Sequence, residues 1–176
     1  KLMEKISADK LQIATSKSAG WSFGDKPETG TAISSVKVSW PANSYLAKWS
    51  TQEKRWLLAQ RGAPDLAASG KQIGPTTFVI QFVSITPSIY HDKVGSVTPL
   101  SKTVGSGTGF VLRDGLAISA KWSRPTLEDG TSWTDLSGKE IKFAAGQVWV
   151  ALTDRKPIFT ELSAQKTADA PSPTTK

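Results

Sequence analysis

Residues 105–126 read GSGTGFVLRDGLAISAKWSRPT, and this stretch decides the fold. Val111 and Leu112 precede the pair Asp114-Gly115, and a second apolar run follows over 116–120. An Asp-Gly pair supplies the positive φ angles that a tight two-residue turn requires. The stretch therefore predicts an antiparallel β-hairpin.

Three more short strands are predicted on the C-terminal side of this hairpin. They cover Ser132 to Thr134, Ile141 to Phe143 and Val148 to Leu152. Turn signals separate them at Asp129-Gly130, Ser137-Gly138 and Ala145-Gly146. Short strands at regular spacing favour a sheet or a barrel.

The N-terminal side also has the pattern of strands. Apolar residues alternate with polar ones over Ile33 to Trp40, and two runs, Tyr45 to Trp49 and Arg55 to Ala59, are spaced as a hairpin. Thr76 to Thr86 is almost continuously β-branched or aromatic. Such a run predicts a strand that is covered on both faces.

The fold class predicted from these patterns is mainly β, as a β-rich α+β domain. We expect short antiparallel strands that form a sheet or a partly open barrel. One short N-terminal helix is expected near residues 3–10, where Leu2, Ile6 and Ile13 form an approximate helical stripe.

The chain length of 176 residues fits one ordinary domain. We expect residues 1–15 to form the N-terminal helix or the remnant of an upstream domain, and residues 16–162 to form the β-rich domain. Residues 163–176 have no large apolar side chain, so we expect a disordered tail there.

Composition indicates a folded, water-facing domain, because 38% of the residues are hydrophobic and 21% are charged. The chain has no cysteine, so these residues can form no disulfide, thiolate nucleophile or cysteine-ligated metal site. The net charge of +7 arises mainly before Val104 and is not concentrated in one block. This spread favours weak attraction to polyanions over a dedicated nucleic-acid groove.

Aromatic and basic residues near the hairpin are the first candidate ligand-binding set. Trp122, Arg124 and Trp133 could bind a ligand, since an arginine beside aromatic rings makes cation–π contacts and ring faces stack on sugars or bases. The structural alternative is that the tryptophans face the core and that Arg124 donates hydrogen bonds to loop carbonyls. Stacking on single-stranded nucleic acid would require exposed tryptophan beside lysine or arginine.

Catalytic groupings are sparse. Glu128, Asp129, Asp135 and Glu140 could supply the two carboxylates of a glycan hydrolase, although Glu128-Asp129-Gly130 also reads as a simple turn. The one histidine, His91, is interpreted as a surface residue. Gly105, Gly107 and Gly109 precede no helix pattern, so close packing or a bulge is favoured over phosphate binding. We expect no metal and no cofactor.

The segment from Gly105 to Thr126 resembles the C-terminal domain of the YerB-like bacterial lipoprotein family, a family of unknown function. The Gly-Ser-Gly segment, the Asp-Gly turn, Trp122 to Pro125, Gly138-Lys139 and Gly146 to Trp149 carry the resemblance, which extends over about 16–153. Asp65, after Gly62-Ala63-Pro64, is similar to an acidic position in the family's loop. The alternative for Asp65 is a hydrogen bond to its own backbone.

The resemblance implies an upstream domain and a location on the outer face of the cytoplasmic membrane, through a lipidated cysteine outside these residues. The leading hypothesis is a non-catalytic binding or structural module of a cell-envelope lipoprotein. Its expected partners are an envelope protein, its own upstream domain or an anionic wall polymer, with no nucleic acid. The alternative is an envelope glycan hydrolase, or an accessory to one, with a site shared with an upstream domain.

Overall fold

The computed structural model describes residues 20–162, and the predicted helix of 1–15 and tail of 163–176 lie outside this range. Twelve strands and no helix are present in the described residues. The predicted α+β class is therefore wrong for this part of the chain, which is all-β. No helix of sufficient length and apolarity to cross a bilayer occurs between residues 20 and 162.

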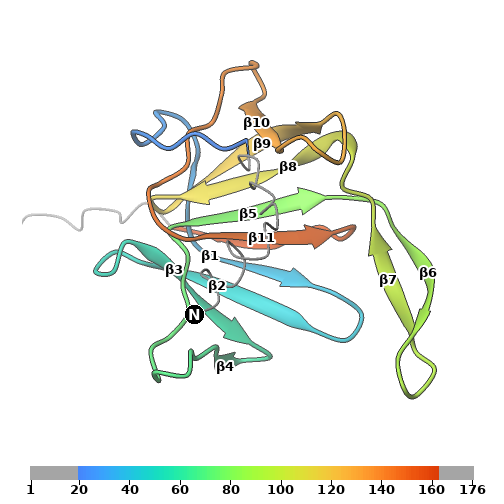
Figure 1. The fold of residues 1–176 in the computed structure, drawn as a ribbon. Coiled ribbons are helices and arrows are strands. Elements are labelled where there is room, and N and C mark those ends of the chain that lie inside the picture. The colour runs from blue at the N-terminus through green and yellow to red at the C-terminus, as the bar shows by residue number, and fades with distance from the viewer. Residues whose placement is uncertain (1–19, 163–176) are drawn as a thin grey trace, which may run out of the picture.

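Ten of the strands form one sheet (Figure 1). Its main path runs in the order β11-β5-β8-β9-β1-β2-β3-β4, while β10 pairs with β9 and β12 pairs with β1. The bounds of these ten strands are β1 Thr31–Ser39, β2 Ser44–Ser50, β3 Arg55–Gln60, β4 Ala63–Pro64, β5 Thr77–Phe82, β8 Gly105–Arg113, β9 Leu116–Arg124, β10 Ser132–Asp135, β11 Val148–Thr153 and β12 Ile158–Glu161. The remaining strands, β6 Ile85–His91 and β7 Val97–Ser101, form a separate two-stranded ribbon.

The hairpin predicted from residues 105–126 is confirmed as β8 and β9, which pair from Gly105 and Arg124 inward to the turn. Asp114 has a φ of 52° and Gly115 a φ of 74°, so both central residues adopt the left-handed conformation. The predicted strand over 33–40 and the hairpin over 45–59 are also confirmed, as β1, β2 and β3.

The sheet curls, so that its two ends face each other across a common core. Buried side chains of β2 and β3 pack in one cluster with those of β5, β8 and β11. Within β3, the amides of Trp56 and Leu58 donate to the carbonyls of Pro75 and Ile73, just before β5 begins. The result is a half-barrel. Its strands are not all antiparallel as predicted, because β11 pairs with β5 in parallel.

Aromatic contacts, which we call the aromatic seam, join the free edge of β11 to β1 and β2. The ring centroids of Tyr45 and Trp149 are 5.6 Å apart, and those of Trp40 and Tyr45 are 6.3 Å apart. Trp40 Nε1 also donates to the carbonyl of Leu152 at 2.8 Å. The seam thus replaces a ladder of backbone hydrogen bonds at this edge.

A second core cluster covers the other face of the central strands. It contains Val79 of β5, Trp122 of β9, Trp133 of β10 and two residues of the following loop, Ile141 and Phe143. Strand β5 therefore has both faces buried, as its apolar run predicted.

The predicted strand over 141–143 is wrong, because only Phe143 among these residues forms a bridge, an isolated one with Phe23. Ile141 and Phe143 are buried by side-chain packing, without a ladder of backbone pairs.

Candidate functional site

Trp122 and Trp133 lie side by side on neighbouring strands and are buried, with 4% and 3% of their surface exposed. Trp122 Nε1 donates to the carbonyl of Phe82 at 3.1 Å. Neither ring face is open for stacking, so the structural alternative holds for both tryptophans. The exposed Trp–Arg platform that single-strand binding needs is absent at these two positions.

The alternating glycines of β8 leave the space into which these tryptophan side chains pack. Gly107 is paired with Trp122, and a Cβ at Gly107 would lie 2.7 Å from Trp122 Nε1. A Cβ at Gly109 would lie 2.1 Å from the carbonyl oxygen of Ile80 and 3.2 Å from the Trp133 ring. Close packing, and not phosphate binding, therefore explains these two glycines.

Arg124 holds the loop that follows β9. Its Nε donates to the carbonyl of Asp129 at 2.9 Å and its Nη2 to that of Leu127 at 2.7 Å. Nη1 also donates to Thr103 Oγ1 at 3.2 Å, just before β8 begins. The predicted hydrogen bonds from Arg124 to loop carbonyls are confirmed.

Asp65 lies apart from the other three candidates, directly after β4 at the far end of the sheet order. Its backbone amide donates to the carbonyl of Leu58, and its carbonyl accepts the amide of Ile73. Burial, and secondarily the negative charge of Asp65, raises the pKa of Tyr45. Asp65 thus acts on the aromatic seam rather than on the hairpin.

The four acids considered for glycan hydrolysis are divided between two turns. Asp129 accepts hydrogen bonds from the backbone and the hydroxyl of Thr126, which confirms the predicted turn. Glu140 accepts one from Ser22 Oγ at 2.6 Å.

Asp135 has a pKa below its ordinary value, because it accepts hydrogen bonds from the Ser137 hydroxyl and from the amides of Ser137 and Lys139. A general acid requires the opposite shift.

Elsewhere, His91 is exposed, as predicted, but it is the last residue of β6 and not part of a loop. Between residues 20 and 162, no group of three or more histidine, cysteine or acidic side chains is placed to hold a metal ion.

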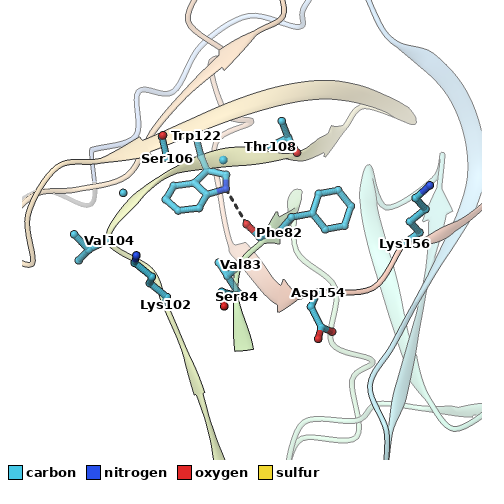
Figure 2. Close-up of a pocket in the computed structure, with 12 residues that line it drawn as sticks. Phe82, Val83, Ser84, Lys102, Val104, Ser106, Thr108, Trp122, Asp154 and Lys156 are labelled. Carbon is cyan, nitrogen blue, oxygen red and sulfur yellow. Dashed lines mark hydrogen bonds between the residues drawn. The ribbon is translucent and has the colours of Figure 1, made fainter. Parts of the chain in front are cut away.

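An open groove of about 690 Å³, which we call the lysine groove, lies on the surface of the described residues (Figure 2). It lies where β5 ends, β8 begins and β11 turns toward β12. Its lining residues are Phe82, Val83, Ser84, Lys102, Val104, Gly105, Ser106, Gly107, Thr108, Trp122, Asp154 and Lys156.

The lysine groove combines positive charge, hydroxyl groups and an aromatic surface. Figure 2 shows Lys102 and Lys156 at opposite ends, with the Phe82 ring between them. Ser84, Ser106 and Thr108 add exposed hydroxyls.

The lysine groove also contains one carboxylate, that of Asp154. Lysine and hydroxyl groups bind phosphate or sulfate oxygens, and a ring face packs against a sugar or a glycerol carbon.

Packing and hydrogen bonds fix the walls of the lysine groove. The amide of Lys102 donates to the carbonyl of Ser84 at 2.9 Å, which holds the two segments together. The indole of Trp122, on β9, donates to the carbonyl of Phe82 at the end of β5, so this hydrogen bond links the two strands at the groove. The ring centroids of Phe82 and Phe110 are 6.0 Å apart, so the floor of the groove is part of the core.

Sequence reasoning placed one lining residue, Trp122, in the candidate set and missed the charged and hydroxyl side chains of the groove. Ser84, Lys102 and Lys156 belong to three separate segments with no shared motif. Only the pairing of β5 with both β8 and β11 brings these segments together.

Comparisons with known proteins agree with the resemblance found in the sequence. A family model described as protein of unknown function (DUF3048), C-terminal domain, matches residues 36–150. The crystal structure of the YerB protein from Bacillus subtilis is similar in fold, with a TM-score of 0.65 and 14% sequence identity. The match covers 91% of this chain and 53% of the YerB chain, so this chain spans about half of that protein. No curated protein matches the sequence.

Proposed function

The chain belongs to the DUF3048 C-terminal domain family, and we propose that it is a non-catalytic binding module of an extracytoplasmic cell-envelope lipoprotein. Its proposed ligand is an anionic wall polymer, held in the lysine groove. The observation that carries this proposal is the pair of lysines at the two ends of an open groove lined by hydroxyls.

The chemistry of the groove suits a polymer with repeated phosphate groups. Lys102 and Lys156 would each contact one anionic group, while Ser84, Ser106 and Thr108 donate hydrogen bonds to the same oxygens. The Phe82 ring would pack against the carbon atoms between two phosphates. An open groove accepts an internal stretch of a long polymer, which a closed pocket would exclude.

A binding role fits the acids of the domain better than hydrolysis. Asp129, Asp135 and Glu140 each accept hydrogen bonds that stabilise local structure. The lysine groove itself contains one acid, Asp154, whereas glycan hydrolysis uses two carboxylates. Binding requires no cofactor.

The envelope location and the lipid anchor rest on the resemblance to the lipoprotein family. An upstream domain would be a further partner, and the matched YerB chain is about twice as long as the part that this chain covers. In this arrangement the upstream part carries the anchor and the present domain binds the polymer.

The test is a titration with poly(glycerol phosphate) of defined length, monitored by isothermal calorimetry at low and at high salt. The wild-type domain is expected to bind, and affinity should fall as salt rises, because counterions are released from the polymer. A Lys102→Gln/Lys156→Gln variant should bind at least about tenfold more weakly, since each lost charge contact weakens binding.

The matched control is Lys48→Gln/Lys71→Gln, which removes two exposed lysines that do not line the groove. It changes the net charge equally. Equal loss of affinity in both double variants would show that the polymer is bound by general charge attraction. That result would overturn the assignment of the binding site to the groove. Absence of binding by the wild-type domain would overturn the proposal that its ligand is an anionic wall polymer.

A further inference from the structure

The ribbon of β6 and β7, residues 85–101, projects from the body of the domain and is called the arm (Figure 1). Its strands pair only with each other. Ser84 and Lys102 flank the arm at its base, where the amide of Lys102 donates to the carbonyl of Ser84.

Large apolar side chains are exposed around the far end of the arm. The exposed fractions are 84% for Ile89, 69% for Tyr90 and 86% for Val94. Val97 and Leu100 on the second strand are 45% and 59% exposed. Single exposed apolar residues are normal, but five along one short ribbon, three of them next to its turn, indicate an interaction surface.

The turn at the end of the arm satisfies its own polar groups. Asp92 Oδ1 accepts the amides of Val94 at 2.9 Å and Ser96 at 2.8 Å, and the Asp92 amide donates to the carbonyl of Ser96. These hydrogen bonds hold the pKa of Asp92 below its ordinary value. The one acid of the arm is therefore engaged in the turn, while Lys93 beside it remains an exposed cation.

The edges of the arm are unsuited to pairing with another strand. Pro87 and Pro99 lie opposite each other, and neither has an amide hydrogen to donate. The register is also irregular between Pro87 and His91. Both features prevent edge-to-edge addition, so an occupant must be bound through the side chains at the tip.

We propose that the tip of the arm inserts into the interfacial region of an anionic lipid bilayer. Ile89 and Val94 would enter the boundary of the acyl chains, and Tyr90 would lie at headgroup depth, where tyrosine is favoured. Lys93 at the tip would contact an anionic headgroup, and the net charge of +7 would attract the domain to an anionic surface. This inference does not depend on polymer binding in the lysine groove.

The absence of cysteine from the chain allows a site-specific optical test. A Val94→Cys variant labelled with an environment-sensitive fluorophore is mixed with vesicles of equal parts phosphatidylglycerol and phosphatidylcholine. The emission should shift to the blue and rise several-fold as the label leaves water. A Leu127→Cys variant, whose site is 70% exposed on a loop outside the arm, should show no change.

Vesicle sedimentation with unlabelled protein gives the second measurement. An Ile89→Asn/Tyr90→Ser/Val94→Asn variant should lose at least about tenfold in vesicle affinity, because burial of its apolar surface is removed. The control Leu127→Asn/Leu136→Asn, which changes two exposed leucines outside the arm, should bind as the wild type does. Unchanged near-ultraviolet circular dichroism would confirm that both variants are folded.

Three outcomes would overturn the proposal. The first is an unchanged emission of the label at 94 with anionic vesicles. The second is an equal response to pure phosphatidylcholine, which would eliminate the role of Lys93 and of the net positive charge. The third is a dimer that the tip variant converts to a monomer in light scattering, since the arm would then bind a second copy of the chain.

Discussion

At the scale of single residues, the alternating glycines of β8 are the most restrictive positions. A Cβ at Gly109 would meet backbone, whereas one at Gly107 would meet the indole of Trp122. At Gly24 the nearest atom is the flexible Lys142 Cδ, which can move away. The three sites therefore differ in what an added methyl group must displace.

We expect Gly109→Ala to destabilise the domain most, by about 3 kcal/mol, and Gly107→Ala by about 1 to 2 kcal/mol. Gly24→Ala is the control and should change stability by less than about 0.5 kcal/mol. Urea unfolding followed by tryptophan fluorescence measures all three. If Gly107→Ala were as stable as Gly24→Ala, the close seating of Trp122 would be refuted.

The candidate site was predictable from sequence only in part. The structural alternatives for Trp122, Trp133 and Arg124 followed from their places on or beside strands, and these hold. The lysine groove was not predictable, because Lys102 and Lys156 are far apart in sequence and meet only through the sheet. The identity of a single residue does not indicate which distant segments the sheet will bring beside it.

At the scale of elements, Arg113 at the end of β8 connects three segments. Its Nη1 donates to the carbonyls of Gly24, Asp25 and Lys142 at 3.0, 3.1 and 2.6 Å. Its Nε pairs with the Asp114 carboxylate at 2.6 Å, and the side chain is almost fully buried. The segment before β1 is thereby held against the loop that precedes β11.

Arg113→Lys should cost about 2 kcal/mol or more, because one ammonium group cannot replace the fork of donors and leaves buried carbonyls without a partner. Hydrogen exchange should accelerate at residues 22–26 and 141–143. Arg155→Lys, at an exposed position, is the control. Unchanged exchange in both segments would show that Arg113 does not hold them.

Elements that form from neighbouring residues were predicted well. The β8–β9 hairpin and the β2–β3 hairpin have their turn signals and apolar runs together in the sequence. The arm was missed because its apolar residues are exposed and both strands contain a proline, which ordinarily argues against a strand. Strand β12 was missed because it is four residues long and is stabilised by the distant β1.

At the scale of the whole molecule, the aromatic seam contributes to how the stability of the half-barrel changes at alkaline pH. Burial and the charge of Asp65 raise the pKa of Tyr45, so the folded domain holds the phenolic proton more tightly than the unfolded chain does. This contribution to stability is complete at neutral pH. It is lost as pH rises above about 10 and through the raised pKa.

Tyr45→Phe should therefore flatten the alkaline fall of the unfolding free energy, and Asp65→Asn should make that fall smaller, because it brings the pKa of Tyr45 in the folded domain closer to its value in the unfolded chain. The measurement is urea unfolding at a series of alkaline pH values. Tyr90→Phe, on the exposed arm, is the control and should retain the wild-type slope. A Tyr45→Phe profile parallel to that of the wild type would contradict this role of the seam.

The pairing of β1 with β12 also has a consequence for the order of events in folding. Ile33 lies opposite Glu161, and Phe78 of β5 lies opposite Trp149 of β11. The members of each pair are far apart in the sequence, and closing the long loop between them costs entropy before any contact is gained. The hairpins should therefore form early and the complete sheet late. Until β11 and β12 pair, β1 and β5 have unpaired edges, and in that interval the chain is exposed to aggregation through these edges.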